Sequence, residues 1–234
     1  MKAYFFFIAI CTGFFTANAV SRYAVYKAAL GPEEELDKKL LDLGTLNGMA
    51  YCRSEEKAVW FVRVIAIVLW VLTACIYGEG WLFLLYSLCI TLLLGLSYVD
   101  IKINELPPLL NAMIAALGAI RVVMDLSHWY EYLIGAVAVS GLFLLIGILS
   151  KGQAMGGGDV KLMAALGLLL GWQKILLVLL VGAVSGTVIH GLMMLIRKDG
   201  HALAFGPYLA AGAVVAMLWG DKLISLYLGA VLNR

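Results

Sequence analysis

The chain of 234 residues is strongly apolar: hydrophobic residues make up 63%, charged residues only 14%, and the mean hydropathy is +0.97. An ordinary soluble domain is nearer half apolar and a quarter charged, so this composition excludes one and predicts an integral membrane protein. The net charge of +2 gives no sign of nucleic-acid binding.

The hydropathy pattern predicts an all-α fold, a polytopic membrane helix bundle with about eight transmembrane helices of roughly 20 residues each. The predicted spans are 3–23, 58–77, 81–99, 107–124, 132–149, 159–171, 174–196 and 203–219. The sixth span is short for a full crossing. We divide the chain into a first transmembrane segment (1–26), a short cytoplasmic loop (27–57), a transmembrane core (58–219) and a C-terminal apolar tail at the membrane interface (220–234).

The N-terminal segment has two interpretations. Lys2, an apolar run and Ala17-Asn18-Ala19 have the layout of a cleavable signal peptide. If the segment is instead retained with its N-terminus outside, 12 of the 17 Lys and Arg residues fall on or near the cytoplasmic side. That orientation is favoured, and it places the 100–106, 150–158 and 197–202 loops together on the cytoplasmic face.

The first candidate functional residue is Asp100, at the end of the third span. A carboxylate at the end of an apolar helix is unfavourable against lipid, so it should face the bundle interior or water. A solvated helix end, with Lys102 as its neighbour, is the alternative. Pro107-Pro108 is predicted to open the next helix, because proline is tolerated in a first helical turn and not in a helix interior.

The second candidate is Asp159, which follows three glycines, Gly156, Gly157 and Gly158, and precedes Lys161. The glycines permit backbone conformations and close approaches that side chains forbid. The alternative interpretation is an N-cap for the apolar helical run that follows, and one residue can be both cap and catalyst. A phosphate-binding loop is excluded because the glycines are not followed by G-K-[ST].

Two such acids suggest hydrolysis. In a carboxylate pair, one ionised group acts as general base on a water and one protonated group polarises the carbonyl. The chain has no G-x-S-x-G elbow and no H-E-x-x-H motif. A small transporter or channel stays the alternative function, since intramembrane acids also mark ion pathways; such sites favour the midplane, whereas both acids here fall at a predicted membrane edge.

These motifs resemble those of the prepilin peptidases, also called type IV leader peptidases, of the GxGD class of membrane aspartic proteases. The segment 156–162 resembles the second-aspartate motif, and Asp100 with Lys102 and Pro107 resembles the first. The segment 205–213, which contains Gly206 and Pro207, resembles a third segment typical of the family. Presenilin-type members carry a Pro-Ala-Leu motif after the second aspartate, and this chain has none.

The resemblance implies a hydrolase of the bacterial inner (cytoplasmic) membrane that uses Asp100 and Asp159 as its catalytic pair. Its partners would be the lipid bilayer and prepilin or pseudopilin precursors of type IV pili or type II secretion, cut after a glycine on the cytoplasmic side. The supporting residues would be Gly156, Gly157, Gly158, Lys102, Lys161, Pro107, Gly206 and Pro207. No cofactor is expected for proteolysis.

The resemblance also raises a second activity. Bacterial members methylate the new N-terminus with S-adenosylmethionine, and many bind zinc through two cysteine pairs in the loop after the first span. Here the loop at 27–57 holds Cys52 alone, so we expect a zinc-free remnant of the methylation-associated domain and no metal site. Whether methylation is retained stays open.

Overall fold

The computed structural model describes residues 2–30, 56–151, 156–197 and 204–232. Within these ranges the chain forms eight α-helices and one short 3-10 helix, and no strand, which confirms the all-α prediction. The helices belong to two compact units, Met1–Pro107 and Pro108–Arg234. Each unit is described by itself.

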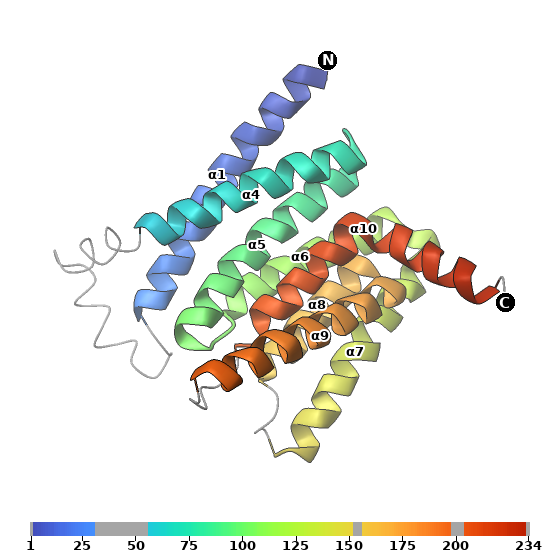
Figure 1. Cartoon of the computed structure of the whole chain (residues 1–234). Coiled ribbons are helices and arrows are strands. Elements are labelled where there is room, and N and C mark those ends of the chain that lie inside the picture. The colour runs from blue at the N-terminus through green and yellow to red at the C-terminus, as the bar shows by residue number, and fades with distance from the viewer. Residues whose placement is uncertain (1, 31–55, 152–155, 198–203, 233–234) are drawn as a thin grey trace. The chain divides into compact units, whose positions relative to one another are not determined.

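The first unit contains α1 (Lys2–Leu30), α4 (Glu56–Tyr77) and α5 (Trp81–Ile103), which pack against one another (Figure 1). A buried polar contact joins two of them: the Trp70 indole N–H of α4 donates to Thr91 Oγ1 of α5 at 2.8 Å. The Trp70 ring also meets Phe83 edge to face, with 5.6 Å between ring centroids. An indole needs a partner for its N–H when it is buried, so Thr91 allows Trp70 to fill this core.

The second unit contains α6 (Pro108–Met124), α7 (Trp129–Leu149), α8 (Gly157–Leu170), α9 (Trp172–Arg197) and α10 (Gly206–Leu232). The short helix α8 contacts each of the other four. Its buried residues lie around the helix: Leu162, Met163, Ala165, Leu166, Gly167, Leu169 and Leu170. A helix that is apolar all round is buried among its neighbours, so α8 is the central element of this unit.

Glycines let the neighbours of α8 approach closely. A Cβ atom at Gly118 of α6 would lie 2.7 Å from Leu168 Cβ and 3.1 Å from the Ala165 carbonyl oxygen of α8. A Cβ atom at Gly135 of α7 would lie 2.7 Å from the carbonyl carbon of Gly171, directly after α8. Small residues at helix contacts are typical of membrane bundles, where close backbone packing drives association.

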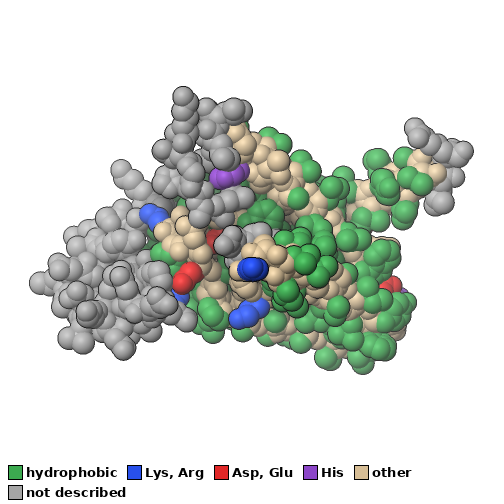
Figure 2. Space-filling model, turned by 90° about the horizontal axis from the view of Figure 1, so that it is seen from below, with side chains coloured by type: hydrophobic (Ala, Val, Ile, Leu, Met, Phe, Trp, Pro, Cys, Tyr) green, Lys and Arg blue, Asp and Glu red, His purple; other side chains and the backbone are tan. Residues whose placement is uncertain are grey.

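Five described helical segments are long and apolar enough to cross a membrane: Trp60–Tyr77, Trp81–Ile103, Leu126–Leu149, Trp172–Leu192 and Gly206–Val231. The helix α6 is a shorter apolar helix of 17 residues, and α8, with 14 residues, is short as the sequence predicted. On the face shown in Figure 2, hydrophobic side chains cover most of the described surface and charged side chains are few. The protein is a multi-pass membrane protein.

Several boundaries differ from the prediction. The helix α1 continues to Leu30 rather than ending at 23, and α10 runs without interruption past 219 to Leu232, so the expected tail at 220–234 is mostly the second half of one helix. Most of the predicted cytoplasmic loop, 31–55, lies outside the described residues, as do 152–155 and 198–203.

Candidate active site

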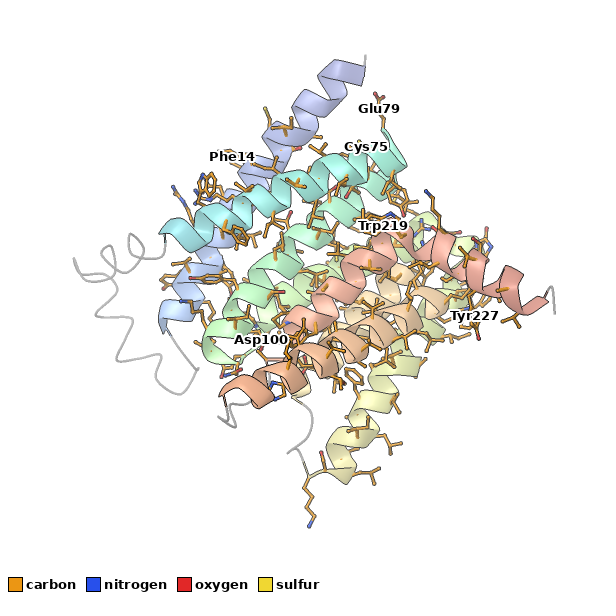
Figure 3. The ribbon with its side chains drawn as sticks, in the orientation of Figure 1. Phe14, Cys75, Glu79, Asp100, Trp219 and Tyr227 are labelled. Carbon is orange, nitrogen blue, oxygen red and sulfur yellow. The ribbon has the colours of Figure 1, made fainter. Side chains whose placement is uncertain are left out.

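Asp100 lies in the last turn of α5, in the first unit. Its side chain is buried, at 5% exposed. Figure 3 shows it at one end of α5, whereas Glu79 marks the opposite end, at the turn between α4 and α5. A buried carboxylate near a helix end matches the predicted interior or water-facing environment rather than contact with lipid.

The backbone after Asp100 ends the helix sharply. Asn104 adopts the left-handed conformation (φ 52°) and donates its backbone N–H to the Asp100 carbonyl oxygen at 2.8 Å. Pro107 is buried, and α6 begins at Pro108, so the predicted role of the proline pair in opening a helix is confirmed. Lys102 is exposed, with its ammonium group 5.8 Å from the centre of the Tyr98 ring.

Asp159 lies in the first turn of α8, in the second unit. The alternative interpretation, that Asp159 is the N-cap of this helix, is wrong: the N-cap is Gly156, whose carbonyl oxygen accepts the Asp159 backbone N–H at 3.1 Å. Gly157 and Gly158 are already helical, so the helix begins earlier than the aspartate. A carboxylate in the first turn is stabilised by the positive end of the helix dipole.

The glycine run leaves space beside Asp159. A Cβ atom at Gly156 would lie 3.4 Å from Asp159 Oδ2, and one at Gly157 would meet nothing within 4 Å. Neither residue has a positive φ. In this structure these two glycines therefore contribute open space next to the carboxylate rather than an unusual backbone conformation.

Asn111 was not predicted from the sequence as part of the site. This residue is on the first turn of α6 and is 5% exposed. Its Nδ2 donates to the carbonyl oxygen of Gly158 at 3.3 Å, which links α6 to the peptide group directly before Asp159. The only sequence signal was a polar residue within an otherwise apolar helix, and nothing in the spacing connects it with Asp159.

The packing contacts place several predicted residues at one end of the second unit. Asn111 pairs with the start of α8, and Gly118 packs near its end, so α6 and α8 run parallel.

The helices α9 and α10 are antiparallel, since Gly186 meets Phe205 and Tyr208 while Lys174 pairs with Asp221. The helix α9 begins directly where α8 ends, and α10 runs back antiparallel to α9. The start of α10 therefore lies at the same end of the second unit as the start of α8. Gly206, which is buried, and Pro207, which is partly buried, are at this start of α10.

The predicted residues thus form one group in each unit. Asp100, Lys102 and Pro107 belong to the first unit. Gly156, Gly157, Gly158, Asp159, Lys161, Gly206 and Pro207 belong to the second, where Lys161 is exposed. Each aspartate lies near the end of its own helix rather than midway along it, which is the position expected of a membrane-edge hydrolase site and not of a midplane transport site.

A second polar cluster lies at the other end of the second unit. Asp125, between α6 and α7, is hydrogen bonded to His128 at 2.9 Å and accepts the Tyr132 hydroxyl at 2.8 Å. These hydrogen bonds, from His128 first and then Tyr132, lower the pKa of the Asp125 carboxyl. Asp125 follows the far end of α6, roughly 25 Å from its start at 1.5 Å per residue, so it is remote from Asp159.

Among the described residues, no group of three or more His, Cys, Asp or Glu side chains is placed to hold a metal ion. Cys52, the one cysteine of the 27–57 loop, lies outside the described residues. The expectation that the loop binds no zinc therefore stays a prediction.

Comparison with known proteins identifies relatives. The model of the type IV leader peptidase family matches residues 86–191, a region that contains both Asp100 and Asp159. A "Prepilin leader peptidase/N-methyltransferase" of Legionella pneumophila is 30% identical over an alignment of 199 residues that covers 81% of this chain and 69% of that protein. The protein of the same name in Aeromonas salmonicida is 31% identical over an alignment of 196 residues that covers 77% of this chain and 66% of that protein.

A third relative of that name, from Bacillus subtilis, is 32% identical over 149 residues, 62% of this chain and 59% of that protein. The chain thus spans about two thirds of the length of the first two relatives. No solved structure matches it significantly. On the extent of these matches, the chain belongs to the type IV leader peptidase family.

Proposed function

We propose that this chain is an aspartic endopeptidase that removes the short basic leader from type IV prepilin-like precursors. The observation that carries the proposal is the family match over 86–191, which includes an aspartate near one end of each of two helices. The substrates would be prepilins or pseudopilins, in keeping with the names of the relatives. Cleavage would take place at the cytoplasmic face of the bacterial inner membrane.

In this proposal Asp100 and Asp159 act on one water molecule. The ionised carboxylate takes a proton from the water as its oxygen attacks the carbonyl carbon of the scissile peptide bond. The protonated carboxyl donates to the carbonyl oxygen, and a proton then passes to the departing amine as the bond to nitrogen breaks. Two carboxylates at roughly 3 Å do not both ionise readily, which supports one proton shared between them.

The surroundings of each aspartate support a distinct contribution. Asp100 is buried in the last turn of α5, at a helix C-terminus. Asp159 lies in the first turn of α8, where the helix dipole favours negative charge and suits the role of base. We therefore assign Asp159 as the first base and Asp100 as the first acid.

Single substitutions test this function. The chain is co-expressed with a tagged prepilin, and leader removal is followed by the size shift of the precursor. Asp100→Asn and Asp159→Asn should each abolish processing while the protein still inserts in the membrane, because each amide can neither take up nor donate the catalytic proton. Processing at the wild-type rate by either variant contradicts the two-aspartate mechanism.

The relatives' names also include an N-methyltransferase activity. S-adenosylmethionine would supply the methyl group, but the loop that the resemblance connects with methylation lies largely in 31–55, outside the described residues, so we assign no residue to it. The mass of the new N-terminus decides this question separately from proteolysis. A product with one extra methyl group establishes the second activity, and an unmodified product made with the methyl donor present excludes it under those conditions.

A further inference from the structure

One buried side chain of the second unit has a geometry that the two-aspartate mechanism does not use. Asn111, on α6, donates its Nδ2 to the carbonyl oxygen of Gly158 at 3.3 Å, and the two residues are 47 positions apart in the sequence. Gly158 is the residue before Asp159, so this contact acts on the peptide group that leads into the proposed base. It ties the first turn of α8 to a neighbouring helix.

The carbonyl oxygen of the same carboxamide, Oδ1, is buried without a hydrogen-bond donor among the described residues. Leaving a buried acceptor without a partner disfavours the folded state by roughly 1–3 kcal/mol, whereas an apolar side chain of similar shape at the same place can be neutral or stabilising. Fold stability alone therefore does not account for an asparagine here.

The first turn of α8 also needs an external support. Its N-cap, Gly156, makes no side-chain capping hydrogen bond, and the glycines before Asp159 have the greatest backbone freedom of any residue type. A catalytic carboxylate on such a turn is poorly fixed unless something outside the turn holds it. The Asn111 side chain supplies such a support, because it donates a hydrogen bond to this turn from another helix.

From these observations we propose that Asn111 is a positioning residue for Asp159, an inference that rests on the proposed peptidase function. Its Nδ2 fixes the Gly158 peptide plane and with it the direction of the Asp159 side chain. Its Oδ1 is an acceptor for a hydrogen-bond donor that enters with the reaction, which we assign as the attacking water. Asn111 positions Asp159 and this water and does not itself exchange a proton.

The test compares Asn111→Leu with wild type and with Met113→Leu. Leucine has a similar size but no hydrogen-bonding group, and Met113 is an exposed residue on the same helix, so the control repeats the new side chain at an outward position. With purified protein and a synthetic precursor, Asn111→Leu should lower kcat roughly 100-fold, the size of effect that a small misplacement of a catalytic group produces. KM should stay within about twofold, and Met113→Leu should match wild type.

Two results overturn the positioning role. If the melting temperature of Asn111→Leu falls in step with its activity, the asparagine is merely structural; the proposal requires a melting temperature equal to or above that of wild type. If KM rises while kcat is unchanged, Oδ1 binds the precursor directly, through a peptide N–H, rather than positioning Asp159 and the water.

A readout without catalysis separates this inference from the proposed function. Hydrogen–deuterium exchange of the peptide covering 156–163 should be faster in Asn111→Leu than in wild type and unchanged in Met113→Leu. If Asp159→Asn cleaves normally, the proposed function fails, and the exchange experiment still decides whether Asn111 holds the turn. If cleavage depends on Asp159 but exchange is the same in all three proteins, the function stands and the positioning role fails.

Discussion

The close contact between α7 and the end of α8 predicts how a substitution at Gly135 changes the stability of the second unit, which contains Asp159. An alanine Cβ atom at Gly135 would lie 2.7 Å from the carbonyl carbon of Gly171, 2.8 Å from Trp172 N and 2.9 Å from the Gly167 oxygen. Ordinary contacts begin near 3.4 Å, so the closest approach falls short by 3.4 − 2.7 = 0.7 Å. All three atoms are backbone atoms, so no side chain can rotate away to relieve the contact.

The magnitude of the effect follows from two opposing contributions. Overpacking of this kind destabilises by about 1–3 kcal/mol, while replacing a helix-interior glycine by alanine stabilises by about 0.5–1 kcal/mol. We expect Gly135→Ala to lower the free energy of unfolding by about 1–2 kcal/mol on balance. For a chain of this length that corresponds to a fall in Tm of roughly 2–8 °C. Activity should fall too, since α8 carries Asp159.

The same substitution six residues further along α7 provides the control. A Cβ atom at Gly141 would meet nothing within 4 Å, so Gly141→Ala retains the helix-propensity gain without the overlap. Thermal unfolding of both variants in the same detergent, followed by tryptophan fluorescence, should show Gly135→Ala below wild type and Gly141→Ala equal to it or above. If Gly135→Ala unfolds at or above the temperature of Gly141→Ala, the close packing of α7 on α8 is wrong.

Two further predictions concern stability elsewhere in the chain. The hydrogen bonds from His128 and Tyr132 lower the pKa of the Asp125 carboxyl from 3.8. The ionised carboxylate therefore contributes its full stabilisation above pH 3.8, and this stabilisation is lost as the pH falls through the still lower pKa of the folded state. Asp125→Asn should therefore lower Tm at neutral pH, and the difference from wild type should shrink in strong acid; a difference that grows in acid contradicts this assignment. In the first unit, Thr91→Val leaves the buried Trp70 N–H without its acceptor and should destabilise by about 1–3 kcal/mol. In a Trp70→Phe background, which lacks the donor, Thr91→Val should destabilise less than it does in wild type, and strictly additive Tm changes would show that the hydrogen bond contributes nothing.

The sequence predicted the helices well where local chemistry decides them. Long apolar runs predicted the membrane helices, and the Pro107-Pro108 pair predicted the start of α6, because proline suits a first helical turn. The end of α10 was missed, since Gly220, Asp221 and Lys222 read as a break after the last apolar run. In the structure the helix continues, and Asp221 pairs with Lys174 of α9 at 2.8 Å, a contact between residues 47 positions apart.

Some residues of the candidate site could also be predicted from the sequence, and others could not. The two aspartates could be found from the sequence, because a carboxylate at the end of an apolar run and one after three glycines are both unusual in a membrane protein. The N-cap of α8 could not be assigned correctly, since Asp is a preferred cap and only the backbone conformation reveals that Gly156 occupies that position. Asn111 could not be connected with Asp159, because its partner is a backbone carbonyl, which has no sequence signature.

The proposed function requires Asp100 and Asp159 together to hydrolyse the leader peptide bond of a prepilin. The most direct measurement is the cleavage rate of a synthetic precursor by purified protein, for wild type, Asp100→Asn, Asp159→Asn and Asp221→Asn, with the products identified by mass spectrometry. Asp221 is 72% exposed and supplies a matched control for the same chemical change. We expect cleavage after a glycine by wild type and Asp221→Asn, and none by the other two variants. Cleavage by either of those at the wild-type rate, in the same folded preparation, would contradict the proposed function.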